Sequence, residues 1–101
     1  MSDNYVVLFV RGKAEKNEKV REVLNDFKEW RIKHRIVDLT EEIQLYGNKV
    51  TLEGAFAIDF SKNGRTRIPV TPFATAGGKI FSGSDKIKEN LTYLSNNYPD
   101  E

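Results

Sequence analysis

The sequence predicts a mixed α/β domain with the element order βαβαββα, in which helices flank a four-stranded mixed sheet. Two observations carry this prediction. The first half reads as a strand, an amphipathic helix and a second strand, which together usually form a right-handed parallel pair. The second half contains two short apolar runs around a glycine pair, typical of an antiparallel hairpin, and then a final helix.

The first half begins with the continuous apolar run Tyr5–Val10, whose β-branched and aromatic residues are typical of a strand covered on both faces. From about residue 15 to residue 31, apolar side chains recur at helical spacing between charged ones. That stretch is predicted to be an amphipathic helix, and residues 34–39 are predicted to be the second strand. The apolar face of the helix consists of Val20, Val23, Leu24 and Phe27.

The middle of the chain admits more than one interpretation. Asp38 and Glu41 have the spacing of a helix cap, and a short helix through residue 45 would end at Gly47-Asn48. Residues 52–60 fit a helix or a strand. A helix is favoured, because Asn63-Gly64 offers a left-handed stop and no turn signal divides the run.

The second half begins after two prolines. Residues 73–75 and 79–81 flank Ala76-Gly77-Gly78, which predicts a hairpin. Ser84-Asp85 is then predicted to cap one last helix that stops near Pro99. The apolar face of that helix would consist of Ile87, Leu91 and Leu94.

Length and composition exclude several classes of protein. The 101 residues fit a single domain, 1–101, and 16 basic against 15 acidic residues leave a net charge of +1, which gives no field to recruit nucleic acid or an anionic membrane. The apolar run is too short to span a bilayer, so a cytoplasmic location is expected. The absence of cysteine excludes disulfides, thiolate nucleophiles and zinc-thiolate sites, and a single histidine, His34, excludes a multi-histidine metal site.

Two long stretches resemble glutaredoxins. From Thr71 onward, the run TPFATAGGKIFSGSD is similar to the carboxy-terminal half of that family, in which a cis X-Pro bond opens a strand and a glycine turn precedes the last helix. Residues 7–24 are similar, without a gap, to the family's first strand, active-site loop and first helix. The segment Gly64-Arg-Thr resembles the phage-type members. The resemblance implies a thioredoxin-like fold.

In this overlay the family's Cys-x-x-Cys motif falls on residues 14–17, so Ala14 and Asn17 stand where the sulfurs would be. Thiol–disulfide exchange requires a thiolate, and no other side chain replaces it. Glutaredoxin activity is therefore excluded, and no catalytic residue is predicted. The chain also departs from the family at Ser82, which replaces a glycine, at the additional Pro69, and in a longer connection over residues 40–50.

The resemblance also implies a ligand site. A γ-glutamyl peptide such as glutathione would pair with the main chain beside a cis proline, and its carboxylates would be held by the turn before the last helix and by basic side chains. Glu15 would oppose an anion there, and the proline and the turn also have purely structural explanations. The implied ligand-binding residues are Arg11, Lys13, Arg67, Thr71, Pro72, Gly83, Ser84 and Asp85.

Two functional hypotheses follow. The favoured one is a redox-inactive glutaredoxin-like binding module, a monomer or weak dimer, that takes a protein segment or a small acidic peptide in the former active site without a cofactor or metal. The alternative is a glutathione-binding, transferase-like enzyme in which the hydroxyl of Tyr5, Ser82 or Ser84 stabilises the thiolate of the ligand. Nucleic acid and membrane are not expected as partners.

Overall fold

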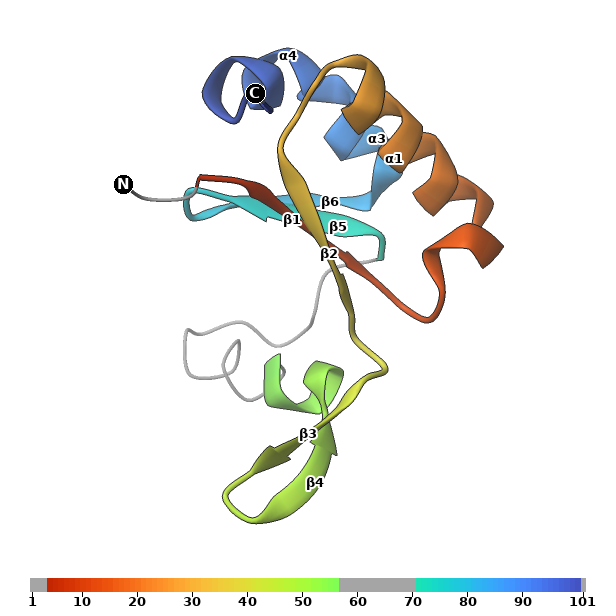
Figure 1. Cartoon of the computed structure of the whole chain (residues 1–101), viewed down its shortest axis with the longest axis vertical. Helices are drawn as coiled ribbons and strands as arrows, with labels where there is room; N and C mark the ends of the chain where they lie inside the picture. Colours follow the sequence, from red (N-terminus) through yellow and green to blue (C-terminus); the bar gives the residue numbers. More distant parts are fainter. Residues whose placement is uncertain (1–3, 57–70, 101) are drawn as a thin grey trace.

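A computed structural model describes residues 4–56 and 71–100 (Figure 1). Its main sheet has four strands in the order β2-β1-β5-β6. The central β1 is parallel to β2 and antiparallel to β5, and β6 is antiparallel to β5. The predicted mixed sheet is thereby confirmed. Its strands are β1 (Val6–Val10), β2 (His34–Asp38), β5 (Phe73–Ala76) and β6 (Lys79–Ser82).

The segment between β1 and β2 contains two helical pieces where one was predicted. A short 3-10 turn, η1 (Ala14–Lys16), precedes α1 (Glu18–Glu29). The break falls at Asn17, which has an extended backbone and whose side chain accepts a hydrogen bond from the Val20 amide. Helix α1 therefore begins at a side-chain cap, a few residues later than the apolar spacing indicated.

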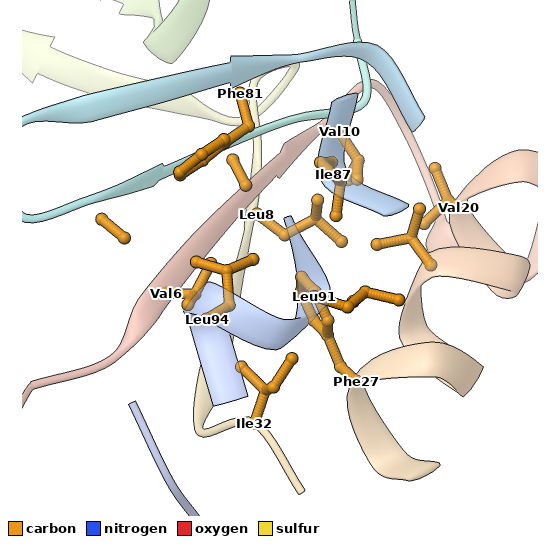
Figure 2. Packing of buried hydrophobic residues seen from close by; sticks show 13 residues of the cluster. Val6, Leu8, Val10, Val20, Phe27, Ile32, Phe81, Ile87, Leu91 and Leu94 are labelled. Carbon is orange, nitrogen blue, oxygen red and sulfur yellow. The ribbon is translucent and has the colours of Figure 1, made fainter. Parts of the chain in front are cut away.

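The first hydrophobic cluster lies between the sheet and the helices α1, α3 and α4, all on one face (Figures 1 and 2). Alternate residues of β1, namely Val6, Leu8 and Val10, point into it and are at most 1% exposed. They meet the apolar face of α1, where Phe27 is fully buried. The packing partners shown in Figure 2 include Val20, Ile32, Phe81, Ile87, Leu91 and Leu94.

The opposite face of the sheet carries a second, smaller cluster built on aromatic rings. Phe9 of β1 stacks on Phe73 of β5, with 4.7 Å between ring centroids. The edge of Phe56 meets Phe9 at 5.1 Å and an interplanar angle of 84°. Leu39 is buried in the same cluster. The strand β1 is thus covered on both faces, as its continuous apolar run predicts.

The predicted short helix through residue 45 is wrong. A separate hairpin, β3 (Glu42–Leu45) and β4 (Asn48–Thr51), stands there and projects away from the main sheet (Figure 1). Its loop is the pair Tyr46-Gly47, with φ of 54° and 80°, and two such positive values define the tight turn that matches strand twist. Residues that the capping pattern assigned to a helix instead alternate polar and apolar along β3.

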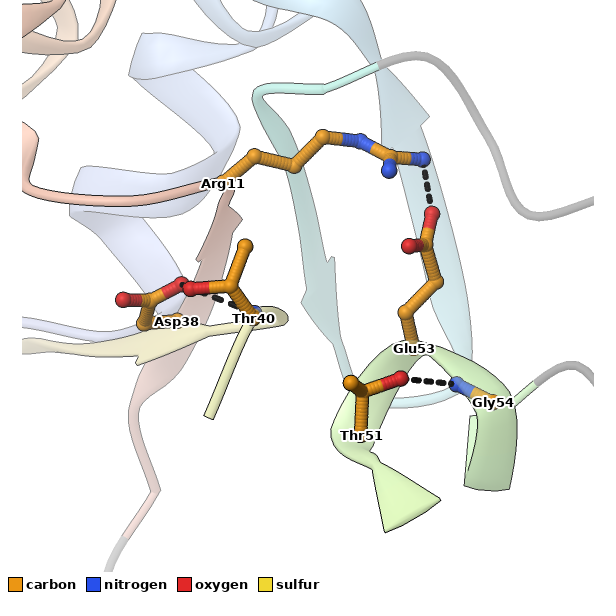
Figure 3. Close-up of polar contacts among 6 residues, drawn as sticks. All are labelled: Arg11, Asp38, Thr40, Thr51, Glu53 and Gly54. Atoms are coloured by element: carbon orange, nitrogen blue, oxygen red, sulfur yellow. Dashed lines mark hydrogen bonds and ion pairs between the residues drawn. The ribbon is translucent and has the colours of Figure 1, made fainter. Parts of the chain in front are cut away.

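A helix follows β4, and its described part covers residues 52–56. The Thr51 hydroxyl caps the start of this helix by accepting a hydrogen bond from the Gly54 amide at 3.1 Å (Figure 3). Leu52 and Phe56 pack on the second cluster. The described part agrees with the favoured helix, whereas the remainder of the 52–60 stretch and Asn63-Gly64 lie outside the described residues.

The carboxy-terminal region confirms the hairpin around Gly77-Gly78 but not the single last helix. Two helices, α3 (Gly83–Glu89) and α4 (Leu91–Asn97), meet at Asn90, whose side-chain amide donates to the Lys86 carbonyl and competes with the helical pattern. Ser82 occupies the position before α3, without a side-chain cap bond, so the predicted Ser84-Asp85 cap is wrong. No helix in the described ranges is long and apolar enough to cross a membrane.

The turn of the β3–β4 hairpin offers a stability test. Tyr46 has a left-handed backbone conformation, and its side chain is 90% exposed. Packing of the ring therefore does not offset the free-energy cost of that conformation. Because asparagine tolerates this conformation, Tyr46→Asn should raise the free energy of unfolding in urea by about 0.5–1 kcal/mol. Tyr46→Ala, the control, should change it little. A loss of stability in Tyr46→Asn would show that the tyrosine ring packs on something.

Candidate functional site

The predicted site residues that the structure describes gather at one end of the main sheet. Phe9 pairs with Phe73 across the antiparallel β1 and β5, so the residues that follow β1 lie beside those that precede β5. Arg11 therefore leaves the sheet next to Thr71 and Pro72, whose peptide bond is cis. Phe73 also pairs with Ser82, which brings Gly83 to the same edge. We call this end, formed by Arg11, Lys13, Thr71, Pro72 and Gly83–Asp85, the sheet-end site.

The members of the sheet-end site differ in exposure. Arg11, Lys13 and Asp85 are exposed, whereas Pro72 and Ser84 are buried. Helix α3 has only seven residues, so the main-chain amides at its start, and not a long helix dipole, are what it offers a ligand. Arg67, the remaining predicted member, lies outside the described residues.

Arg11 is engaged by a carboxylate of the same chain. Its guanidinium forms an ion pair with Glu53 in the helix after β4, and Figure 3 shows the arginine reaching across toward that helix. The two side chains are 48% and 35% exposed, so solvent screens the pair. Sequence reasoning missed Glu53, because it belongs to another element and no local spacing links it to Arg11.

Asp38 organises the loop after β1. One of its carboxylate oxygens accepts hydrogen bonds from the Gly12 amide, the Thr40 amide and the Thr40 hydroxyl, at 2.9, 2.9 and 2.7 Å. Figure 3 shows Asp38 beside Thr40. Gly12 has φ of 80°, a conformation that favours glycine. The interpretation of Asp38 as a helix cap is therefore wrong, since it holds two loops together.

The same contacts shift the ionisation of Asp38. The Thr40 hydroxyl, the Thr40 amide and the Gly12 amide all donate to the charged form and lower the pKa of Asp38 below its ordinary value of 3.8, against a smaller opposing effect of burial. The carboxylate is consequently charged at neutral pH and keeps its hold on the loop that carries Arg11 and Lys13.

Ala14 and Asn17, the positions on which the resemblance places the family's cysteines, both have structural roles. Ala14 is partly buried and packs against the first hydrophobic cluster. Asn17 caps α1 through its bond to the Val20 amide at 3.2 Å. An asparagine directly before an amphipathic run is a helix-start signal, and this role was detectable in the sequence. Neither side chain can form or exchange a covalent bond with a disulfide.

Other candidate groups lie away from the sheet-end site. Tyr5 precedes β1 and is thus at the opposite end of that strand, where the Arg35 guanidinium lies 4.9 Å from its ring centroid. The ring of His34 packs against Phe27. Among residues 4–56 and 71–100, no group of three His, Cys, Asp or Glu side chains is placed to hold a metal ion.

The strand order, the helices on both faces and the cis proline before β5 together define a glutaredoxin-like, thioredoxin-type fold. A solved structure with this fold, a buckwheat glutaredoxin in complex with glutathione, superposes with a TM-score of 0.59 over 92% of this chain and 77% of that chain. The two sequences are 17% identical, so the likeness concerns the fold. No protein-family model matches the sequence, and no curated protein matches it.

The capping role of Asn17 can be tested by substitution. Asn17→Ala removes the acceptor for the Val20 amide and should lower the free energy of unfolding by about 1 kcal/mol. Asn17→Asp and Asn17→Ser keep an acceptor and should stay close to the unsubstituted protein in the same urea titration. Equal stability of Asn17→Ala and Asn17→Asp would contradict the role.

The Asp38 contacts predict a pH dependence with a defined sign. The pKa of Asp38 is lower in the folded chain, so its contribution to stability is present above pH 3.8 and disappears as pH falls through the folded pKa. The amide NMR shifts of Gly12 and Thr40 should therefore stay constant down to pH 3.8 and change below it. Asp38→Asn should abolish this titration. A transition above pH 4 at both amides would contradict the assignment.

Proposed function

We propose that this chain is a binding module without redox activity, working in the cytoplasm, and that the sheet-end site receives a protein segment or a small acidic peptide. The observation that carries the proposal is the convergence of Arg11, Lys13, Thr71-Pro72 and the start of α3 at one sheet end, where no thiol is present. The scaffold that positions a peptide is retained, while the atoms that react with sulfur are absent.

The chemistry of the site favours a ligand with a carboxylate. An extended segment beside Thr71 would pair with its main chain, as a strand added to a sheet does. The guanidinium of Arg11 suits bidentate recognition of a carboxylate, and Lys13 adds a second positive charge. Arg67 is proposed as a further contact. The amides of Ser84 and Asp85 would donate to a second anionic group.

Glu53 would compete with an acidic ligand for Arg11. It supplies to Arg11 the same group that an acidic ligand would supply, so the ligand carboxylate has to replace it. An exposed ion pair of this kind contributes about 0.2–1 kcal/mol, which a ligand making several contacts can exceed. The Arg11–Glu53 pair would therefore lower the affinity for acidic ligands without preventing their binding.

A second candidate, a glutathione-binding and transferase-like enzyme, is favoured by one observation, namely that a protein of the same fold was solved with glutathione. Such an enzyme needs a hydroxyl near the ligand's thiolate. Tyr5 lies at the other end of β1 and Ser84 is buried, which leaves Ser82 as the exposed candidate. The binding module remains our main proposal, since it requires no reactive group.

The proposal is tested by titrating the protein with glutathione and with a short acidic peptide, followed by amide NMR shifts. Shifts at Thr71 and Ser84 are expected. Glu53→Gln should raise the affinity for acidic ligands by about 2- to 5-fold, because it removes the competing ion pair with Arg11. Arg11→Gln should lower that affinity. Glu89→Gln, which breaks the exposed pair with Lys86 on α3, is the matched control and should leave affinity unchanged.

Three results would count against this proposal. An absence of shifts at Thr71 and Ser84 with every ligand would move the binding site elsewhere. Turnover in a glutathione-coupled disulfide reductase assay with the purified protein would contradict a redox-inactive module. Turnover of an electrophile with glutathione that Ser82→Ala abolishes would favour the enzyme.

A further inference from the structure

A second surface, separate from the sheet-end site, lies between α1 and the edge strand β2. It is a groove of about 330 Å³ with an apolar floor formed by Ala14, Leu24 and Ile36. Ile36 pairs with the buried Leu8 and points toward the same face of the sheet, yet it is 45% exposed because α1 covers the central strand and not the edge. We call this surface the α1–β2 groove; in Figure 1, β2 runs through the middle of the view and α1 lies above it to the right.

The charges around the groove are unequal. Arg21, Asn25 and Lys28 line it from successive turns of α1, so a cation lies on each side of Leu24. Within the described ranges neither Arg21 nor Lys28 forms an ion pair, although Glu22 on the same helix pairs with Lys88 of α3. Glu15, the one carboxylate of the lining, belongs to η1, which precedes α1.

The open edge of β2 supplies main-chain groups beside the groove. β2 is the terminal strand of the four-stranded sheet. The Lys33 carbonyl accepts from the Val6 amide and the Leu39 amide donates to the Val10 carbonyl, at 2.9 and 2.8 Å. Every second residue of a parallel strand bonds to its neighbour, so these odd-numbered residues face β1 and the main-chain groups of Ile36 face the open edge.

We propose that the α1–β2 groove binds an extended acidic peptide segment of a partner protein, which adds to β2 as a further strand. One apolar side chain of the segment would rest on Leu24 and Ile36. Acidic residues two positions before and after it point to the same face and would meet Arg21 and Lys28. The recognised pattern is therefore acidic-x-apolar-x-acidic.

The dimensions agree with this pattern. Arg21 and Lys28 are seven residues apart, which corresponds to about 10.5 Å along a helix axis. Two residues four positions apart in a strand are separated by about 13 Å. Both cationic side chains are long enough to cover the difference. The negative charge of Glu15 would repel a further acidic residue of the peptide at that end of the groove. The site therefore favours the stated pattern over a uniformly acidic tail.

The test uses synthetic seven-residue peptides with the centre Glu-Thr-Leu-Thr-Glu, titrated against the whole chain. Binding should shift the amide NMR signal of Ile36 and should weaken as salt is added. The double variant Arg21→Glu with Lys28→Glu should lose at least tenfold in affinity, and Ile36→Thr should weaken binding while keeping a β-branched residue in the strand. Lys19→Glu, a single charge reversal elsewhere on α1 and half the change of the double variant, should bind normally.

Three outcomes would overturn the proposal. If a Lys-Thr-Leu-Thr-Lys peptide bound as tightly as the Glu-Thr-Leu-Thr-Glu peptide, Arg21 and Lys28 would not select acidic residues. Loss of binding in Arg11→Gln with no loss in the Arg21/Lys28 double variant would place the peptide at the sheet-end site instead. Self-association in sedimentation that Ile36→Thr abolishes, without any peptide binding, would make a second copy of the chain the occupant. The Ile36 amide shift with this peptide should be unchanged in Arg11→Gln, whereas shifts at Thr71 and Ser84 report the sheet-end site, so this proposal and the proposed function fail separately.

Discussion

The burial of β1 on both faces is the constraint on which the rest of the structure depends. Leu8 and its alternate neighbours need α1 and α3 on one side, and Phe9 needs the rings of Phe73 and Phe56 on the other. Both faces of a sheet with β1 at its centre must therefore be covered, one by α1, α3 and α4 and the other by the second cluster. The ends of β1, β5 and β6 then meet at one edge, so the sheet-end site is a consequence of the core and not a separate construction.

The sequence was informative wherever local pattern and core packing agree. The apolar run of β1, the face of α1 and the Gly77-Gly78 turn were all predicted, because each is decided by neighbours in the chain. The β3–β4 hairpin was missed, since the capping pattern of Asp38 and Glu41 has the same residue types as a loop. At the site, the gathering of Arg11 with Thr71-Pro72 followed from the resemblance. The Glu53 pair did not, because only tertiary structure brings it to Arg11.

Ala14 and Asn17, which the resemblance aligns with the cysteines of glutaredoxins, are part of the scaffold in this chain. Ala14 contributes a methyl group to the edge of the core, and Asn17 satisfies an amide at the first turn of α1. Placing cysteine at both positions would remove a helix cap as well as add thiols. The loop between β1 and α1 is held instead by Asp38 through the Gly12 amide, so its shape does not depend on an active-site disulfide.

The longer connection between β2 and the following helix positions the carboxylate that pairs with Arg11. It carries the chain out through the β3–β4 hairpin and back to Thr51, whose cap sets the start of the helix that presents Glu53. Arg11 is thus neutralised by a carboxylate that solvent screens and a ligand can displace. A neutral ligand would form no ion pair with Arg11. An acidic ligand would form one, which would offset the loss of the Arg11–Glu53 pair. On the proposed function, selection at this sheet end would therefore rest on the exchange of one carboxylate for another at Arg11, and it would require no chemistry at Ala14 or Asn17.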